Sequence, residues 1–278
     1  MNFRDLTRFL RAFLFVVLIP LGANAQDTAP GVKLPPGFTH LELTVDGVAR
    51  EAEVYAPDSA KTKPAPVVFV FHGHGGTARN VVRSFAMNQH WPEAISVYMQ
   101  GLKTPGQLTD PEGTKPGWQG QPGAQGDRDL KFFDAMLARL KQDYKVDDKR
   151  LFSTGHSNGG GFTYLLWAER GDLFAAFAPS SASALRIMDK LKPKPALHIA
   201  GQTDPLVKFE WQQMTMDAVR KINGCDEEGK AWAPNCTLYP SKTGTPFIAC
   251  IHPSGHTFIP EAPELIAKFF KEQAAAVK

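Results

Sequence analysis

Apolar positions fall into short continuous runs separated by segments with a helical repeat. Three runs rich in β-branched and aromatic residues have the pattern of strands buried on both faces of a sheet: 66–71, 95–99 and 151–154. Three more apolar runs predict further strands at 174–178, 196–200 and 246–251. Apolar residues three and four positions apart predict a helix that Asp127 or Asp129 could cap and that runs through Tyr144. Further helices are predicted over 162–169 and 209–223 and around 265–270. This alternation favours an α/β fold with a mostly parallel sheet.

Residues 40–55 and 101–126 depart from this pattern. Alternating apolar and polar residues flank Asp46-Gly47, and Asp-Gly between two alternating runs is the strongest short hairpin signal. We therefore predict an antiparallel hairpin at one edge of the sheet. Residues 101–126 are rich in Gly, Pro and Gln and have no repeat, so they predict a long loop of the kind that is usually functional or mobile.

The N-terminal residues have the composition of a targeting signal rather than of a folded element. Three arginines precede an apolar stretch, 12–22, that is too short to span a bilayer comfortably, and Ala23-Asn24-Ala25 is a typical cleavage motif. The sequence predicts a signal peptide over 1–25 with cleavage after Ala25, a flexible arm over 26–38, and one folded domain over 39–278. We expect a secreted or periplasmic protein with no membrane span after cleavage.

The composition and the cysteines narrow the class of protein. A chain of 278 residues is long enough for one sizeable core, and a net charge of +3 gives no reason to expect nucleic acid as a partner. There are three cysteines, and export favours a disulfide. Of the three pairings that the sequence allows, we predict Cys225–Cys236, which would close a short polar loop; Cys236–Cys250 is the cross-strand alternative. No C-x-x-C spacing indicates a metal site.

Gly155-His-Ser157-Asn-Gly159 forms a G-x-S-x-G motif between a predicted buried strand and a predicted helix. A serine held on a tight strand-to-helix turn is a nucleophile elbow, and only small residues fit two positions before and after it. The helix that starts at the elbow points its positive N-terminal end at the reacting centre. Ser157 is therefore the candidate nucleophile.

A serine nucleophile needs a base, and the chain order Ser, Asp/Glu, His belongs to the α/β-hydrolase architecture. Asp204 directly follows the predicted strand 196–200 and is the candidate acid. His256 lies in the loop after the last predicted strand and is the candidate base, with His252 as the competitor at the strand end. His156 belongs to the elbow itself and cannot reach back to act as the base.

The developing oxyanion needs hydrogen-bond donors near the nucleophile. We assign them to the backbone N–H groups of Asn158 and His74, with Gly75 as the alternative to His74. His74 belongs to the segment 72–76, whose small residues let the backbone approach a ligand. A serine triad requires no metal or cofactor, and the sequence indicates neither. Three aromatic or polar residues are candidate substrate contacts: Trp118, Gln119 and Trp211.

These motifs occur together and in order, and over residues 40–278 the chain resembles the secreted esterase family of polyhydroxybutyrate depolymerase-like proteins and feruloyl or acetylxylan esterases. The resemblance implies a lidless α/β-hydrolase that cleaves carboxylic esters, with Ser157, Asp204 and His256 as the triad. Phe258 stands where the family often has a tryptophan after the histidine, and no C-terminal polymer-binding domain is visible. Both departures favour small or oligomeric esters over solid polyester.

Three other functions fit the same scaffold. A cutinase-like polyester hydrolase shares the Gly-His-Ser-x-Gly-Gly-Gly run but must present an open groove. A small serine peptidase of the prolyl-oligopeptidase type keeps the triad, although the sequence shows no propeller and no acidic pocket. A binding protein on a hydrolase scaffold is disfavoured by the intact triad order. The sequence specifies neither the acyl and alcohol groups of the substrate nor the oligomeric state.

Overall fold

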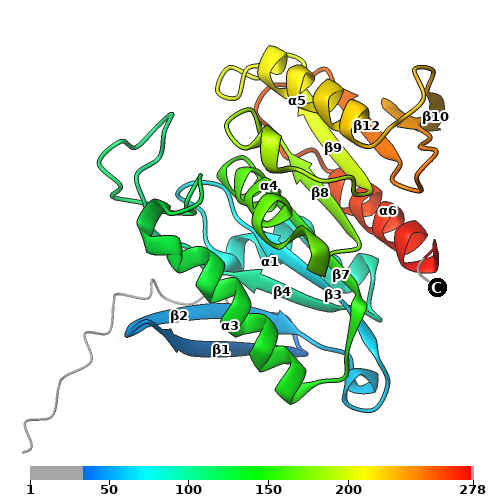
Figure 1. The fold of residues 1–278 in the computed structure, drawn as a ribbon. Helices are drawn as coiled ribbons and strands as arrows, with labels where there is room; N and C mark the ends of the chain where they lie inside the picture. The colour runs from blue at the N-terminus through cyan, green and yellow to red at the C-terminus, as the bar shows by residue number, and fades with distance from the viewer. Residues whose placement is uncertain (1–33, 277–278) are drawn as a thin grey trace, which may run out of the picture. The chain divides into compact units, whose positions relative to one another are not determined.

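The computed structural model describes residues 34–276, so the predicted signal peptide and most of the predicted arm lie outside the described residues. Within this range a ten-stranded sheet has the order β1-β2-β4-β3-β7-β8-β9-β12-β11-β10 (Figure 1). Its strands are β1 (Phe38–Val45), β2 (Val48–Tyr55), β3 (Ala65–Phe71), β4 (Ile95–Met99), β7 (Val146–His156), β8 (Ala176–Ser180), β9 (Ala196–Gly201), β10 (Lys230–Ala233), β11 (Cys236–Tyr239) and β12 (Phe247–His252). A separate two-stranded sheet pairs β5 (Leu102–Lys103) with β6 (Pro116–Gly117).

Helices connect most of the central strands. The α-helices are α1 (Ala78–Phe85), α2 (Met87–His90), α3 (Arg128–Asp143), α4 (Asn158–Arg170), α5 (Phe209–Ile222) and α6 (Ala262–Ala276). Short 3₁₀-helices cover Asp58–Lys61, Ala124–Asp127, Gly171–Leu173 and Met188–Lys190. None of the helices within residues 34–276 has both the length and the apolar character needed to cross a membrane.

The middle of the sheet is parallel and its two margins are antiparallel. Neighbouring strands from β4 through β3, β7, β8 and β9 to β12 run in the same direction. At one margin the β1–β2 hairpin turns at Asp46-Gly47 and β2 pairs antiparallel with β4, and at the other margin β11 and β10 follow β12 antiparallel. The predicted mostly parallel sheet with an N-terminal antiparallel hairpin is confirmed.

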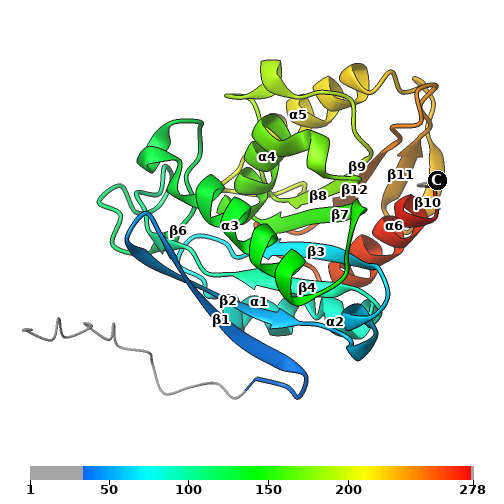
Figure 2. The same ribbon diagram turned by 60° about the horizontal axis from the view of Figure 1, so that its bottom comes forward.

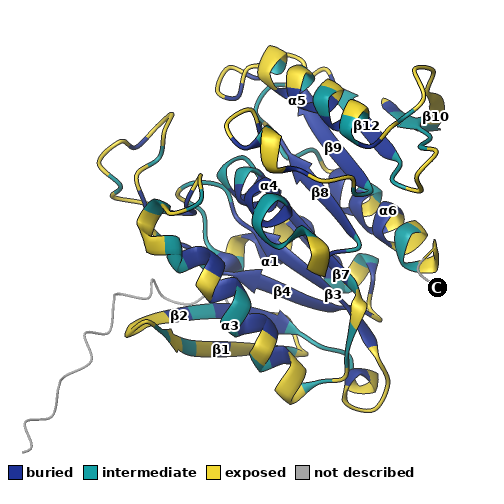
Figure 3. Cartoon of the chain, viewed as in Figure 1, coloured by how far each residue is buried: buried dark blue, intermediate teal, exposed yellow. Residues whose placement is uncertain are grey.

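Two apolar layers cover the two faces of the sheet. Successive residues of a strand point to opposite faces. Val67, Phe69 and Phe71 of β3 therefore share one cluster with α3, α4 and α5, whereas Val68 and Val70 share another with α1, α2 and α6. Figure 2 shows helices on both sides of the sheet, and Figure 3 shows the buried strands between them. Because both faces are covered, all of β3 is buried, which explains its continuous apolar run.

The cysteine pairing differs from the prediction. Cys225 does not pair with Cys236; the disulfide joins Cys236 to Cys250, and Cys225 is a free, half-buried cysteine. The prediction is wrong because the segment after α5 is not a simple loop. It forms the β10–β11 hairpin, and β11 lies antiparallel to β12 with Cys236 directly opposite Cys250. The cross-strand alternative is the observed one.

Candidate active site

Ser157 occupies a sharp turn between β7 and α4, with φ 57° and ψ −120°. Such a conformation is strained for a residue with a side chain. A Cβ at Gly155 would lie 2.5 Å from the carbonyl oxygen of Gly159, and a Cβ at Gly159 would meet the carbonyl oxygens of Phe71 and His72. The two glycines therefore let the elbow press against the end of β3, which holds the serine at the carboxyl edge of the sheet.

Three side chains from distant parts of the chain form a continuous hydrogen-bonded line. His256 Nε2 lies 2.8 Å from Ser157 Oγ, and His256 Nδ1 lies 2.7 Å from Asp204 Oδ2. Asp204 follows β9 and His256 follows β12, so both loops leave the same edge of the parallel sheet as the elbow. The Asp204 side chain is fully buried, and its Oδ1 accepts the backbone N–H groups of Leu206 and Val207, each at 2.9 Å. The structure thus brings together the nucleophile, base and acid candidates.

Two other histidines lie near this line. His252, the competitor for the base, ends β12 with its ring buried, and neither ring nitrogen has a hydrogen-bond partner among residues 34–276. It is His256 that contacts Ser157. His156 packs its ring 5.0 Å from the ring of His256, and its Nδ1 lies 3.2 Å from Ser180 Oγ. Burial, reinforced by repulsion from His256, lowers the pKa of His156 to about 3. His156 is therefore a neutral neighbour of the imidazole that contacts the serine.

The two candidate oxyanion donors border Ser157 in the same pocket. Asn158 is the first residue of α4, and His74 lies in the turn after β3. The alternative donor is engaged elsewhere, because the backbone N–H of Gly75 donates to the Pro116 carbonyl at 2.7 Å. The geometry thus favours His74 over Gly75 as the second donor.

Side chains of these two donor residues fasten the 101–126 segment to the elbow. Asn158 Oδ1 accepts the backbone N–H of Trp118 at 2.7 Å, and its Nδ2 donates to the Trp118 carbonyl at 3.1 Å. His74 Nε2 lies 2.9 Å from Asp110 Oδ2, and this hydrogen bond holds the pKa of Asp110 well below its usual range. Neither contact was predicted from the sequence, because Trp118 and Asp110 both lie in the 101–126 segment, which has no repeat that would indicate their partners.

A pocket of about 600 Å³ opens above Ser157. The loop segment 105–109 lines it, and so does the segment 182–187 that follows β8. Leu206, Val207 and Trp211 line the side next to the Asp204 turn. The volume falls in the range of small-molecule sites, about 300–1,000 Å³.

The three predicted substrate contacts have different positions. Trp211 lines the pocket and is 37% exposed. Trp118 also borders the pocket, but it is almost fully buried, stacks on Phe162 and donates its indole N–H to the His72 carbonyl at 2.9 Å. Gln119 is buried and does not line the pocket. Its side-chain oxygen accepts a hydrogen bond from the backbone N–H of Asp129 at the start of α3, so the side chain caps the N-terminal end of this helix.

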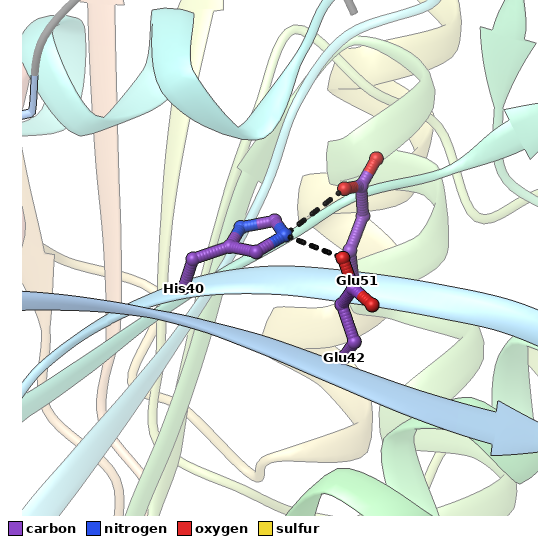
Figure 4. Close-up of side chains that lie close together, drawn as sticks. All are labelled: His40, Glu42 and Glu51. Carbon is purple, nitrogen blue, oxygen red and sulfur yellow. Dashed lines mark hydrogen bonds and ion pairs between the residues drawn. The ribbon is translucent and has the colours of Figure 1, made fainter. Parts of the chain in front are cut away.

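A cluster suited to a cation lies elsewhere. Within residues 34–276, one group of side chains has ligand atoms close enough together to hold a metal ion: His40, Glu42 and Glu51. Figure 4 shows His40 Nε2 between the two carboxylates, 3.3 Å from each. These residues belong to the β1–β2 hairpin at the margin of the sheet, whereas Ser157 follows the central strand β7. The cluster therefore has no part in the chemistry at Ser157.

Comparison with known proteins agrees with the fold. No family model matches the chain. It is 29% identical over 221 residues to feruloyl esterase C of Emericella nidulans, covering 78% of each protein. It is 26% identical over 207 residues to the bifunctional acetylxylan esterase/xylanase XynS20E of Neocallimastix patriciarum, covering 69% of this chain and 28% of that protein. The structure of an acetyl xylan esterase from Aspergillus awamori superposes with a TM-score of 0.60 at 16% identity, over 84% of this chain and 99% of that one.

The sheet topology and these relatives define the chain as a carboxylic ester hydrolase with the α/β-hydrolase fold. Its relatives at the sequence level are feruloyl and acetylxylan esterases, which confirms that part of the predicted resemblance.

Proposed function

We propose that the protein is an exported serine esterase that works through an acyl-enzyme. The observation that carries the proposal is the unbroken line from Asp204 through His256 to Ser157 at the floor of the pocket. The fully buried Asp204 carboxylate orients the imidazole and stabilises the imidazolium that forms during the reaction.

The reaction follows from this arrangement. Ser157 Oγ attacks the ester carbonyl while His256 Nε2 takes its proton, and the N–H groups of Asn158 and His74 bind the resulting oxyanion. Collapse breaks the bond to the alcohol, which leaves with the proton from His256. Water then attacks the acyl-enzyme with His256 as the base again, releasing the carboxylic acid and restoring Ser157. No metal or cofactor takes part in these steps.

Replacement of the nucleophile tests the proposal directly. We expect Ser157→Ala to lower kcat on p-nitrophenyl acetate by about 10⁴-fold or more, because the acyl-enzyme cannot form. Ser153→Ala is the matched control, since Ser153 is a buried serine of β7, the strand that leads to Ser157, and does not line the pocket. Turnover that survives Ser157→Ala would overturn the serine mechanism.

The substrates that we propose are small or oligomeric esters, of the feruloyl, acetyl or 3-hydroxybutyrate type. The relatives are named for feruloyl and acetylxylan esters, and a pocket of about 600 Å³ suits one such unit. Side-by-side assays of methyl ferulate, acetylated xylan, 3-hydroxybutyrate oligomers and short p-nitrophenyl esters distinguish these classes. Equal, weak turnover of all four would contradict a preference for any of them.

A second candidate function, hydrolysis of polyester surfaces, is favoured by the rim of the pocket. Several of the large apolar side chains that are most exposed in the described part of the chain line this pocket: Leu108, Leu185, Leu206 and Trp211. Apolar patches of this kind mark interaction sites. Release of soluble acid from a polyester film would support the cutinase-like function, and its absence alongside turnover of soluble esters would exclude it.

The proposed layout is a signal peptide over 1–25, a short arm over 26–38, and a catalytic domain over 39–278. The Cys236–Cys250 disulfide supports export, because disulfides persist in oxidising compartments.

A further inference from the structure

The pocket above Ser157 contains one permanent charge and no acid to balance it. Among the residues that line it, Arg186 carries the only permanent charge, and none is an aspartate or a glutamate. Arg186 is an exposed residue of the segment after β8 that lines the pocket. Its Nη1 donates to Oε1 of Gln107, which also lines the pocket, at 2.6 Å.

Arg186 is unusual among the arginines of this protein. Every other arginine in residues 34–276 except Arg83 forms an ion pair with a carboxylate: Arg50, Arg79, Arg128, Arg139, Arg150, Arg170 and Arg220. The bond to Gln107 fixes one edge of the Arg186 guanidinium and leaves its other N–H groups without an acceptor within the described residues. An arginine that is held in place at a substrate pocket, yet unpaired, is suited to bind an anion from the substrate.

We propose that Arg186 binds a carboxylate of the substrate, and that the preferred substrates are esters that also carry a free carboxyl group. Half-esters of dicarboxylic acids and the acid end of an oligoester belong to this class. The planar guanidinium matches a carboxylate with two parallel hydrogen bonds. Leu185 and Leu206 line the same pocket, and apolar neighbours strengthen such a pair by lowering the local dielectric constant. This inference rests on the proposed function, since it names the substrate of the same site.

Matched pairs of substrates test the charge alone. Para-acetoxybenzoate and para-acetoxybenzamide differ only in a carboxylate on the alcohol side of the ester, and monomethyl adipate and methyl adipamate differ in the same way on the acyl side. We expect the wild-type protein to prefer the carboxylate of at least one pair in kcat/KM. The pair that shows the preference tells which side of the ester faces Arg186. Because Arg186 is exposed, the preference is expected to be about three- to tenfold and to shrink as ionic strength rises.

Arg186→Gln removes the charge and keeps a polar side chain. We expect it to abolish the preference by raising KM for the carboxylate substrate, while turnover of the neutral amide stays within about twofold. Arg83→Gln is the matched control, because Arg83 is the other arginine of residues 34–276 that forms no ion pair, and it lies exposed on α1 outside the pocket. The proposal would be overturned if the wild-type protein showed no preference for the carboxylate substrate. It would also be overturned if Arg186→Gln lowered kcat/KM equally for the carboxylate and the amide substrate. Ser157→Ala is expected to lose turnover of both substrates, whereas Arg186→Gln is expected to lose only the preference for the carboxylate substrate. The two variants therefore test the serine mechanism and the role of Arg186 separately.

A second inference concerns a buried chain of hydrogen bonds behind Asp204. Gln212 Nε2 donates to Asp204 Oδ2 at 3.1 Å, Gln212 Oε1 lies 3.2 Å from His198 Nε2, and His198 Nδ1 lies 2.7 Å from Tyr164 Oη. Gln212, His198 and Tyr164 are fully buried, and they come from α5, β9 and α4. The chain ends on Oδ2, the same carboxylate oxygen that contacts His256.

The hydrogen bonds of this chain have one consistent direction. Gln212 Nε2 also donates to the Val207 carbonyl at 2.7 Å, so its amide nitrogen faces Asp204 and its oxygen faces His198. Burial lowers the pKa of His198 to about 4, so the ring carries a single proton near neutral pH. That proton must be on Nε2 to reach the Gln212 oxygen, and Nδ1 then accepts the hydroxyl proton of Tyr164. Every donor in the chain therefore points toward Asp204.

We infer that Gln212 is a positioning residue for the reaction at Ser157, with His198 and Tyr164 holding its amide in the required orientation. Its N–H keeps the Asp204 carboxylate from rotating and withdraws charge from Oδ2. Without that donor, Oδ2 interacts more strongly with the imidazolium of His256, which raises the pKa that governs the acid limb of the kcat/KM profile. This inference also rests on the proposed function.

Gln212→Leu and Gln213→Leu make a matched comparison on one helix. Gln213 is the next residue of α5, and its amide bonds to Asp217 instead of Asp204. We expect Gln212→Leu to lower kcat about tenfold with KM within twofold and to move the acid limb to higher pH, whereas Gln213→Leu changes neither. A folded Gln212→Leu variant with an unchanged kcat and pH profile would overturn the inference.

Two further variants distinguish loss of the positioning role from misfolding and from failure of the proposed triad. Gln212→Glu keeps the shape of the side chain and donates to Asp204 only when its carboxyl is protonated. We expect its kcat relative to wild type to rise as pH falls, and a constant ratio would contradict the role. Asp204→Asn tests the triad: if its activity is normal, the proposed mechanism fails, whereas an inactive Asp204→Asn with a normal Gln212→Leu removes only the positioning role.

Discussion

At the scale of single residues, the position of Ser157 against β3 requires glycines, which have no side chain, two residues before and two residues after it. Its left-handed backbone lies where the elbow passes closest to the end of β3, and the glycines on either side permit that approach. Not all glycines of the following helix have this role. A Cβ at Gly159 would collide with backbone oxygens of β3, whereas a Cβ at Gly161 would meet nothing within 4 Å.

This difference gives a test within one helical turn. We expect Gly159→Ala to lower the free energy of unfolding by about 3 kcal/mol or more, because rigid backbone must move to admit the methyl group. Gly161→Ala is expected to be neutral or to stabilise by up to about 1 kcal/mol, since alanine favours the helix. Urea denaturation of both variants checks the pair, and equal effects would contradict the close packing of the elbow on β3.

Buried neutral histidines make stability depend on pH. Burial lowers the pKa of His72 to about 4 and that of His198 to about 4, below the value of 6.5 for an exposed histidine. The unfolded chain therefore binds more protons than the folded one between these values, so stability is present above pH 6.5 and is lost as pH falls toward 4. We expect a loss on the order of 1–2 kcal/mol per histidine between pH 7 and pH 5.

Replacing one imidazole isolates its share of this loss. His198→Gln should flatten the pH dependence of the free energy of unfolding, and His90→Gln, at the half-buried last residue of the short helix α2, is the control. Denaturation at pH 7 and pH 5 measures the slope. An unchanged slope in His198→Gln would contradict the neutral, buried state of this ring.

At the scale of elements, the 101–126 segment is fastened to the elbow at several points. Asp110 accepts hydrogen bonds from His74, from Lys115 and from both the backbone and the hydroxyl of Thr114. Because the N–H of His74 is a proposed oxyanion donor, release of its ring should displace that donor.

We expect Asp110→Ala to lower kcat by about 10²-fold, the usual effect of losing one oxyanion donor. Glu112→Ala, an exposed change in the same segment, is the control and should have kcat within twofold of wild type. Steady-state kinetics on p-nitrophenyl acetate measures both. If Asp110→Ala raises KM alone, the segment shapes the pocket without positioning the donor.

The disulfide joins β11 to β12 at the margin of the sheet and closes a short stretch of chain, with a sequence separation of 14. We expect Cys236→Ser/Cys250→Ser to lower the free energy of unfolding by about 3 kcal/mol through the entropy of the unfolded chain. Cys225→Ser removes the free cysteine and is expected to change stability by less than about 1 kcal/mol. Thermal denaturation with and without a reducing agent checks both variants.

The elements that could be predicted from sequence are those whose signal is local. The run 66–71 predicts β3 because both of its faces are buried, and Asp46-Gly47 predicts the hairpin because its turn type needs those residues. The partner of Cys236 could not be predicted, since it depends on β11 pairing with β12. The position of Gln119 also depends on distant contacts, because its side chain serves the start of α3 rather than the pocket beside its neighbour Trp118.

At the scale of the whole molecule, parallel strands explain how distant residues of the described chain converge. The strands that precede Ser157, Asp204 and His256 run in the same direction, so their carboxyl ends meet at one edge of the sheet. Ligand sites of open α/β sheets lie at this edge. The order of the three residues was therefore predictable from sequence, whereas Gln212, which contacts Asp204 from α5, carries no motif.

The proposed export has a direct consequence for the length of the mature chain. We expect the protein recovered from an exporting host to begin at Gln26, because cleavage after Ala25 follows the A-x-A motif. Intact-mass measurement of the secreted or periplasmic fraction checks this, and Ala25→Asp should block cleavage. A mature protein that still begins at Met1 would contradict the signal peptide.

Covalent labelling tests the role of Ser157 most directly. An organophosphonate reacts with a serine only where a base activates it and an oxyanion site accepts the phosphoryl oxygen. Mass spectrometry of the digested, labelled protein should find one adduct, on the peptide that contains Ser157, with activity lost in proportion to labelling, and His256→Ala should prevent the reaction. An adduct on another residue, or full activity with Ser157 completely modified, would contradict the proposed mechanism.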